Sequence, residues 1–416
     1  MLGVGIYWAE DAHVVALGSP DQGVFDVITV AHRPEAVNEL LARIAALEPD
    51  PAEVRVVLET RHGLLAGKLV DAGYTVVPIN PDLIGRRRGP ARKEDDAEDA
   101  RFACLLALDR FVALKPLFPH GEAAAELRAI ARDDARAAKD QRRLLDRLPA
   151  DLLAVFPAVI PIAGDDLGAP TFLKLIEKWP IAADLAQASR AEIEAFARSC
   201  RHGWSDRFAD TVVTALETRQ FTPRPALVRA KADTIRLYAT QLLAIDQQRR
   251  TWERRMGQLL ISHDRGGDMP GRTFTGGEVY LSMAGLGVCL AARIAGEIGD
   301  HPSQFDSPRA LACCAGKAPV TRRSGKSELV VAKRLACNRY LDDAFQDWAF
   351  RSLRWSPWAR DYYDELRARD KGHHAALRSL GVRWLTILWT CLNPGVLYDE
   401  TLHQANRQRA RQQLAA

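Results

Sequence analysis

The segment VRVVLE (residues 54–59) is an apolar run of strand length that ends on an acid. It follows Asp50 and Pro51, a pair typical of a turn. Apolar residues at helical spacing precede it over 34–47, and a second helix is predicted over 63–72. The segment therefore predicts a central strand of a sheet, connected to a helix on either side.

Further strands are predicted on both sides of this segment. Short strand-like runs cover about 3–8, 13–17 and 23–30, and another covers 75–79 before Asn80 and Pro81 stop it. A last helix is predicted over about 95–108. Three strands, a helix, a strand, a helix, a strand and a helix is the order of a ribonuclease-H-like sheet.

Two long amphipathic helices are predicted over about 122–148 and 226–260. The second repeats apolar residues at heptad spacing, and Arg249 interrupts one of its two series. This pattern predicts a coiled coil, formed with the first helix or with another subunit. The residues between them, 151–222, are predicted to be helical and broken by Pro157, Pro161, Pro170 and Pro180.

The chain has 416 residues, which favours two or three domains. We expect an α/β plus α protein, in which a ribonuclease-H-like (RuvC-like) carboxylate domain over 1–115 precedes a helical, coiled-coil region over 116–265. A mainly helical carboxy-terminal domain over 266–416 completes it, after a turn-rich linker with paired glycines. No run approaches the roughly 20 apolar residues of a membrane span, so no membrane partner is expected.

Seven cysteines are scattered through the chain, and none forms a CxxC metal motif. Their odd number gives no disulfide framework, and no basic leader precedes an apolar block at the amino terminus. These features favour a reducing cytoplasm.

Basic residues form two clusters, although the formal net charge is only +4. Such clusters are either solvated faces or contacts to a polyanion such as nucleic acid. The first cluster contains Arg86, Arg87, Arg88, Arg92 and Lys93, and the second contains Lys317, Arg322, Arg323, Lys326, Lys333, Arg334 and Arg339.

Three carboxylates are candidate metal ligands. Glu59 ends the predicted central strand, and Asp96 and Asp99 lie three residues apart on one face of the last helix. Carboxylates at the end of a sheet suit hard divalent cations, which in nucleases hold the attacking and leaving oxygens of a phosphodiester. The alternative for the two aspartates is an exposed helix start favoured by the helix dipole.

Several segments resemble a known family. "VVLETRHGLLAGKLVDAGYTVVPINP" (56–81) and "DAEDAR" (96–101) resemble the DEDD-type insertion-sequence transposases related to the Piv and MooV invertases, the one-hundred-ten insertion-sequence family. "GLGVCLAARIAGEIGD" (285–300), "CAGKAPVTRRSGKS" (314–327), "CNRYLDDAFQDWAF" (337–350) and the segment 356–389 resemble its carboxy-terminal transposase domain. Members of that family act as bridge-RNA-guided DNA recombinases.

The resemblance implies a Mg²⁺ site made by four acids, and Glu59, Asp96 and Asp99 match the second, third and fourth. At the first position the family has an aspartate, whereas this chain has Tyr7. A phenol has a pKa near 10 and is a poor magnesium ligand at neutral pH. We expect a site with one ligand missing and weakened metal binding, unless Asp11 or Glu10 replaces it.

Ser324 lies before Gly325, with Arg322, Arg323 and Lys326 around it. A serine that attacks a phosphodiester needs a flexible backbone and nearby cations. The spacing alone favours a phosphate-contacting loop over a nucleophile. The resemblance implies the second role, a covalent phosphoserine link to DNA, with Ser327 as the fallback position.

Two further features have both a functional and an ordinary interpretation. Residues 285–287 (Gly-Leu-Gly) resemble the hairpin of a helix-hairpin-helix element, whose glycines let backbone N–H groups face a phosphate, but equally fit a tight helix connection. The aromatic residues near the carboxy terminus are either core or stacking platforms for unpaired bases. They are Trp348, Trp355, Trp358, Tyr362 and Tyr363. His373 and His374 have no acid partners at metal spacing.

The expected function is that of a site-specific DNA recombinase or transposase guided by a structured RNA. Its partners would be donor and target DNA, the guide RNA, and further copies of the chain in a dimer or tetramer. One alternative is a catalytically impaired nucleic-acid-binding derivative, which Tyr7 favours. Another is a metal-dependent ribonuclease-H-like nuclease or junction resolvase, which would need the carboxylates but not Ser324.

Overall fold

A computed structural model describes residues 1–59, 63–79, 95–109, 116–118, 120–217, 223–263, 273–301, 304–324, 327–331 and 333–415. The chain forms two compact units. The first contains residues 1–121 and 301–304, and the second contains 122–300 and 305–416. Three segments were predicted, with boundaries after 115 and 265. The second unit includes both the predicted helical region and the predicted carboxy-terminal domain.

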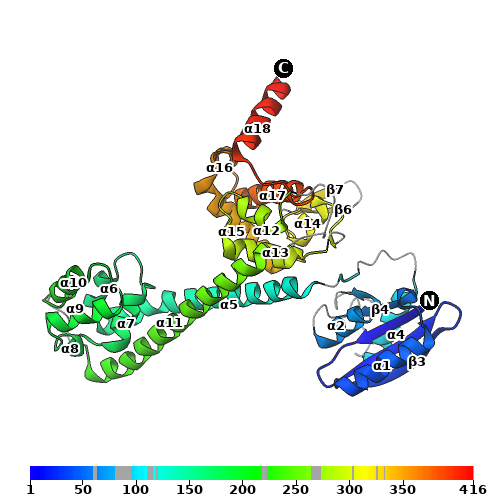
Figure 1. Ribbon diagram of the computed structural model, residues 1–416, viewed down its shortest axis with the longest axis horizontal. Coiled ribbons are helices and arrows are strands. Elements are labelled where there is room, and N and C mark those ends of the chain that lie inside the picture. Colours follow the sequence, from blue (N-terminus) through cyan, green and yellow to red (C-terminus); the bar gives the residue numbers. More distant parts are fainter. Residues whose placement is uncertain are drawn as a thin grey trace. The chain divides into compact units, whose positions relative to one another are not determined.

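The first unit is built on a five-stranded mixed sheet (Figure 1). Its strands are β1 (Leu2–Tyr7), β2 (Ala12–Ser19), β3 (Gly23–Ala31), β4 (Val54–Leu58) and β5 (Thr75–Pro78), in the order β3-β2-β1-β4-β5. The first three strands are antiparallel, whereas β4 is parallel to β1 and β5 is parallel to β4. This sheet agrees with the predicted ribonuclease-H-like class.

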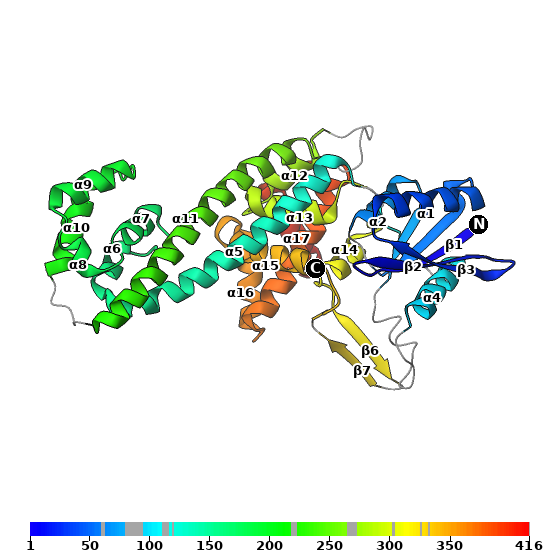
Figure 2. The same cartoon turned by 90° about the horizontal axis from the view of Figure 1, so that it is seen from below.

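Helices cover both faces of the sheet (Figure 2). Strand side chains alternate between the faces, and Leu2, Val4 and Ile6 point into the core beneath α1 (Pro34–Leu47) and α2 (Leu64–Asp71). The opposite face carries α4 (Asp96–Leu108). Odd-numbered residues of β1 therefore face α4, which fixes where the predicted acids lie.

The second unit contains two long helices, α5 (Glu122–Val155) and α11 (Pro225–Ile261), that pack antiparallel. Arg255 of α11 pairs with Glu126 near the start of α5, and Lys231 pairs with Asp151 near its end. Apolar heptad positions of α11 such as Ile235 and Leu242 are buried. The helix pair is therefore present, while a regular coiled coil stays a prediction.

Arg249, which interrupts the heptad series, has a specific partner. Its guanidinium donates to the carboxylate of Asp134 at 2.8 Å and to Gln141 at 2.7 Å. Arg293 donates to the other oxygen of Asp134 at 2.5 Å. Asp134 is fully buried, so one carboxylate joins α5, α11 and the helix that carries Arg293.

Short helices between α5 and α11 enclose a separate hydrophobic core. They are η2 (Pro157–Val159), α6 (Ile160–Ala163), α7 (Pro170–Lys178), α8 (Ala182–Leu185), α9 (Arg190–Ser199) and α10 (Ser205–Glu217). Prolines lie in the first turns of η2, α6 and α7, where a missing N–H costs no helical hydrogen bond. Pro149 lies inside α5, which continues beyond its predicted end at about 148 to Val155, with Leu152 and Val155 buried.

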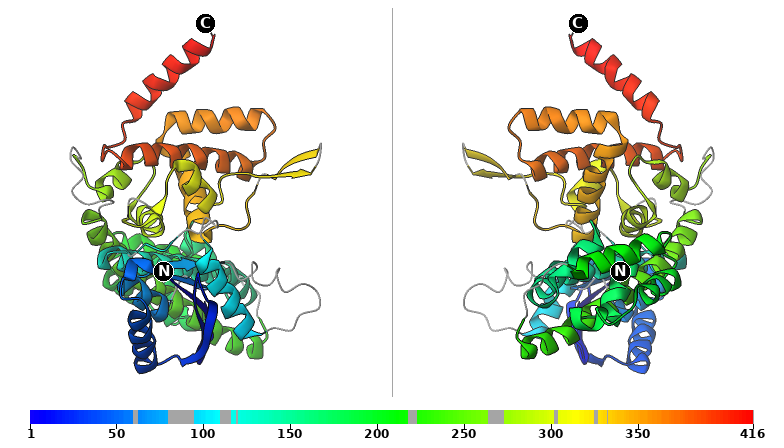
Figure 3. Two further views of the ribbon diagram at one scale, coloured as in Figure 1. Left: turned by 90° about the vertical axis from the view of Figure 1, so that its right-hand side faces the viewer. Right: turned by 90° about the vertical axis from the view of Figure 1, so that its left-hand side faces the viewer.

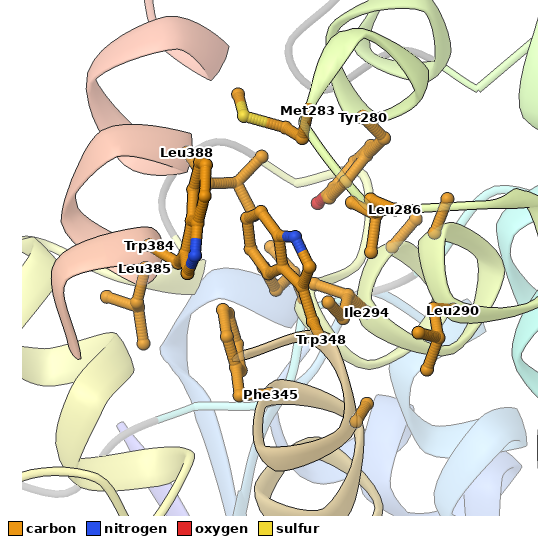
Figure 4. Close-up of a cluster of buried hydrophobic side chains, with 14 of the residues drawn as sticks. Tyr280, Met283, Leu286, Leu290, Ile294, Phe345, Trp348, Trp384, Leu385 and Leu388 are labelled. Atoms are coloured by element: carbon orange, nitrogen blue, oxygen red, sulfur yellow. The ribbon is translucent and has the colours of Figure 1, made fainter. Parts of the chain in front are cut away.

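The remaining elements form a carboxy-terminal lobe. They are α12 (Gly276–Ser282), α13 (Val288–Ile298), α14 (Pro308–Cys314), β6 (Val320–Ser324), β7 (Ser327–Val331), α15 (Arg339–Trp355), α16 (Pro357–Ala368), α17 (His373–Leu392) and α18 (Glu400–Ala415). Trp348 and Trp384 lie at the centre of its core (Figure 4), with ring centroids 4.9 Å apart. Leu127 of α5 and Met256 of α11 belong to the same core, so both long helices are part of this lobe.

Within the described residues, no helix is both long enough and apolar enough to cross a membrane.

Candidate functional site

Helix α4 lies directly on β1 because two glycines leave room for its backbone. A Cβ atom on Gly5 would lie 2.1 Å from the backbone oxygen of Ala100, and one on Gly3 would lie 2.7 Å from the Leu108 side chain. The Cys104 thiol donates to the backbone oxygen of Gly3 at 3.3 Å, and burial raises the pKa of this thiol to about 12. Since Leu108 lies over Gly3 and Ala100 over Gly5, α4 runs antiparallel to β1. Its first turn therefore points toward the end of β1.

Tyr7 is the last residue of β1 and lies two residues beyond Gly5, on the face that α4 covers. Its half-buried side chain packs against Ala16, Ala100 and Cys104. The position at which the resembling family has its first acid is thus occupied by an aromatic ring against α4. Asp11, the predicted substitute, is exposed in the connection to β2, and its backbone oxygen accepts from the His32 N–H at 2.8 Å.

Glu59 follows Leu58, which pairs with Ile6 in the parallel ladder. Tyr7 ends β1 and Glu59 directly follows β4, so the two residues lie at the same end of the sheet on neighbouring strands. Val57 packs in the small core with Ala103 of α4, so the alternation of side chains assigns Glu59 to the α4 face as well. Glu59 is half-buried.

The three aspartates at the start of α4 have different environments. Asp95 caps the helix and accepts from the N–H groups of Ala97 at 2.9 Å and Glu98 at 3.4 Å. Asp96 is exposed, whereas Asp99 is only 4% exposed. The alternative of an exposed helix start therefore fits Asp95 and Asp96, but it does not explain a buried carboxylate at Asp99.

Among the described residues, no group of three or more histidines, cysteines and acids is close enough to hold a metal ion. Magnesium, however, is commonly bound by one or two carboxylates together with substrate phosphates and water. Glu59 and Asp99, at the same end of the sheet and partly or wholly buried, fit such a substrate-completed site. Tyr7 supplies no third carboxylate.

Ser324 is the last residue of β6, in a two-stranded antiparallel hairpin that projects from the helices of its own unit (Figures 2 and 3). Its Cα partner across the hairpin is Ser327, the first residue of β7. The serine was predicted in a loop, and the structure assigns it to a strand end beside a two-residue connection. That connection, Gly325 and Lys326, lies outside the described residues, as do the side chains of Arg322 and Arg323.

Lys317 requires a correction, because the structure buries this predicted nucleic-acid contact. It is 3% exposed, and its ammonium group donates to Asp342 at 2.6 Å and to Gln346 at 3.2 Å. Burial lowers the pKa of Lys317, while Asp342 opposes that shift. A side chain enclosed in this way stabilises the lobe and presents no charge to a phosphate.

The structure describes only some of the other predicted nucleic-acid contacts. Lys333 is exposed, with its ammonium group 3.8 Å from Asp342, and Arg334 is half-buried. The first basic cluster, Arg86, Arg87, Arg88, Arg92 and Lys93, lies outside the described residues.

The aromatic residues divide into two groups. Trp348 and Trp358 are buried, as the core interpretation predicts, and Tyr363 donates to or accepts from His373 Nδ1 at 2.7 Å. Trp355, by contrast, is 65% exposed. Sequence reasoning missed the arginines that accompany it, Arg351, Arg354 and Arg360. Arg351 lies one helical turn before Trp355, which was the available signal.

Comparisons with known proteins match both ends of the chain. The model of DEDD-type IS110 transposases, described as "Transposase", matches residues 4–157. A second model, described as "Transposase IS116/IS110/IS902 family", matches residues 278–364. The first contains Glu59, Asp96 and Asp99, and the second contains Ser324.

Several similar proteins come from bacterial insertion elements. The chain is 29% identical over 406 residues to the "Mini-circle putative transposase for IS117" of Streptomyces coelicolor, covering 95% of each chain. It is 28% identical over 374 residues to the "Insertion element IS900 uncharacterized 42 kDa protein" of Mycobacterium paratuberculosis, covering 89% of this chain and 90% of that one. The "Insertion element IS110 uncharacterized 43.6 kDa protein" of Streptomyces coelicolor is 28% identical over 336 residues, covering 80% and 79%.

These matches confirm the family that the sequence motifs predicted, and they extend over the ribonuclease-H-like sheet and the lobe that carries the hairpin. The chain belongs to the IS110 family of insertion-sequence transposases.

Proposed function

We propose that this transposase is an RNA-guided, site-specific DNA recombinase that cuts and rejoins strands through a phosphoserine intermediate on Ser324. The observation that carries the proposal is the pair of family matches, one over the carboxylates and one over Ser324. A plain ribonuclease-H-like nuclease would need only the first of these.

In the proposed reaction, the Ser324 hydroxyl attacks a phosphodiester. A bond forms between its oxygen and phosphorus, and the bond to the departing sugar oxygen breaks, so that oxygen takes up a proton. Attack by the hydroxyl of another strand end reverses the step and rejoins DNA. The position of Ser324 at the end of a projecting hairpin favours access to a bulky duplex.

A divalent metal, which we propose to be Mg²⁺, would be held by Glu59 and Asp99. The exposed Asp96 would be a further ligand. When bound, such an ion supplies charge stabilisation for phosphoryl oxygens. The carboxylates of this chain would orient the DNA phosphate at the end of β1 and β4. Since no three described acids cluster, the DNA itself would complete the ligand set.

The guide RNA and the oligomeric assembly are also part of the proposal. A structured RNA partner follows from the resemblance to bridge-RNA-guided recombinases. A dimer or tetramer is expected because strand exchange needs more than one nucleophile. The basic residues of the two clusters, Lys317 excepted, would contact nucleic-acid backbones.

A second candidate function is that of a catalytically impaired nucleic-acid-binding derivative. The packing of Tyr7 against Ala100 and Cys104, where a first carboxylate is expected, favours it. In that case the chain would bind its DNA and RNA without forming the covalent link.

The experiment is to incubate the purified chain with donor DNA, the non-coding RNA that flanks the element and Mg²⁺, and then to denature the mixture. We expect a covalent protein–DNA adduct that is lost in Ser324→Ala and retained in Ser327→Ala. Loss of the adduct in Ser327→Ala alone would identify Ser327, across the hairpin, as the nucleophile.

Two other results separate the alternatives. Tight DNA binding without any adduct, in the natural chain and in Tyr7→Asp, would favour the binding-protein function. Strand cleavage that persists in Ser324→Ala would identify a metal-dependent nuclease. Omitting the RNA tests guidance separately, because guidance requires that the adduct depend on it.

A further inference from the structure

A groove of about 1080 Å³ lies within the carboxy-terminal lobe. One wall is the connection between α12 and α13, with Gly285 and Gly287. The other walls are the end of α15, the first half of α16 and the start of α17. None of the proposed catalytic residues lines it.

The groove is positively charged. Arg351, Arg354 and Arg360 line it and are exposed, and Asp347 is the single acid among the lining residues. Within the described part of the chain, neither Arg354 nor Arg360 forms an ion pair, whereas Arg351 interacts electrostatically with Asp347. Two guanidinium groups are therefore available for an anionic ligand.

Two aromatic side chains of the groove are exposed to solvent. Phe350 is 58% exposed and Trp355 is 65% exposed, although Trp348 on the same helix is buried in the core. The guanidinium carbon of Arg354 lies 5.8 Å from the centroid of the Trp355 ring. A large exposed ring beside unpaired arginines is typical of sites that bind single-stranded nucleic acid. In such sites a base stacks on the ring and the arginines neutralise its phosphate.

The glycine connection is fixed against α15 and presents the start of α13. Gly285 has φ +76°, and a Cβ on it would lie 3.0 Å from the backbone of Ser352. The Trp348 indole also donates to the Ala284 backbone oxygen at 2.9 Å. Gly287, the residue before α13, has open space where a Cβ would stand. A backbone can therefore approach the N–H groups of the first turn of α13.

We propose that this groove binds an unpaired segment of DNA, with Trp355 and Phe350 stacking on bases and Arg354 and Arg360 contacting phosphates. The bases must be unpaired because stacking on an exposed ring requires a free base face. The inference rests on the proposed action on DNA, but it does not depend on the chemistry of Ser324.

The test measures binding of a fluorescent single-stranded DNA oligonucleotide to the full chain, without metal and in a Ser324→Ala background. Loss of one stacking platform predicts roughly tenfold weaker binding for Trp355→Ala, and Trp355→Phe should retain most of the affinity. Arg354→Gln should weaken binding and flatten its dependence on salt concentration.

Matched controls are available in the same chain. Trp204 is 63% exposed and has Arg207 over its ring at 4.7 Å, but it lies outside the groove. Trp204→Ala should leave the affinity unchanged, as should Arg254→Gln on α11. Because Trp355 and Trp204 are both exposed, neither substitution removes a core side chain.

Several results would overturn the proposal. Equal affinity of Trp355→Ala and the natural chain would exclude stacking, and an equal loss in Trp204→Ala would exclude a specific groove. The same loss on a duplex of equal length would identify a duplex-binding surface. Binding to a single-stranded RNA of the same sequence that is tighter than to DNA, and lost in Trp355→Ala, would assign the groove to RNA. Adduct formation can fail without affecting any of these results, so the two proposals are separately testable.

Discussion

Gly5 of β1 and Ala100 of α4 are in direct backbone contact, with no space for a side chain between them. A Cβ atom on Gly5 would lie 2.1 Å from the oxygen of Ala100 and 2.1 Å from the nitrogen of Cys104. This contact sets the height of α4 above the sheet. It therefore also sets the position of Asp99 relative to the ends of β1 and β4.

Gly5→Ala should destabilise the first unit by about 3 kcal/mol or more, because the new methyl group meets backbone that cannot rotate away. Hydrogen exchange of β1 and α4 peptides in the full chain would measure the loss. Gly67, in the middle of α2, has open space around it. Gly67→Ala should therefore stabilise by about 0.5–1 kcal/mol, and a similar loss at both glycines would contradict the account.

Tyr7→Asp should bind divalent metal more tightly, because it adds a carboxylate beside Glu59 and on the face that Asp99 shares. We expect a gain of roughly tenfold or more in affinity for Mn²⁺ or Mg²⁺, measured by titration calorimetry. Tyr7→Phe keeps the packing against Ala100 and removes only the hydroxyl, so its metal affinity should equal that of the natural chain. If Tyr7→Asp gained nothing, the end of β1 would not be a metal site.

The first unit should lose stability as the pH falls below about 6.5. Burial, and then the neighbouring His32, lower the pKa of His13 from its ordinary 6.5. The unfolded chain then binds more protons than the folded one below that pH, so unfolding becomes easier. Above it, the neutral ring accepts from the Ala9 N–H at 3.4 Å and bonds His32 at 2.8 Å.

Hydrogen exchange of β2 peptides between about pH 7.5 and about pH 5, corrected for the intrinsic exchange rate, would measure this dependence. His13→Gln should remove most of it, whereas His374→Gln, an exposed site on α17, should not. A pH dependence that survives in His13→Gln would assign it to another group.

Asp134→Ala should cost about 3–5 kcal/mol of unfolding free energy, because it leaves Arg249 and Arg293 without their shared buried carboxylate. Denaturant unfolding followed by helix circular dichroism would detect the change. The side chain of the neighbouring Asp133 is 45% exposed and pairs with Arg136 on the surface, so Asp133→Ala should change stability little. Equal effects at the two positions would mean that the α5–α11 pairing does not depend on this network.

Local patterns predicted much of the fold. The run VRVVLE became β4, and the helix predicted over about 95–108 became α4 with Asp95 as its cap. The hairpin of β6 and β7 was missed, although β-branched residues occur at 320–321 and 330–331 and a glycine first in a two-residue connection is typical of a type II′ hairpin. The basic residues within the segment obscure the alternation of apolar and polar residues that indicates strands.

Local sequence patterns could not predict which side chains pair over long separations. Asp134 meets Arg249 and Arg293 across separations of 115 and 159 residues, and no local pattern encodes such partners. Lys317 lies in a basic cluster by sequence, yet the fold buries it against Asp342. Similarly, Trp348 and Trp355 lie on one helix, and only the packing of the lobe decides which of them reaches solvent.

Leu127 of α5 and Met256 of α11 are core residues of a lobe whose other members extend to Leu392. On the ribosome, α5 is therefore made well before the residues that cover it. Helices α11 and α13 cover α5, so at about 5–20 residues per second its apolar face waits on the order of ten seconds for α13. The nascent chain must carry that uncovered helix until α13 is made, an interval in which an exposed apolar face is open to chaperones that hold emerging chains.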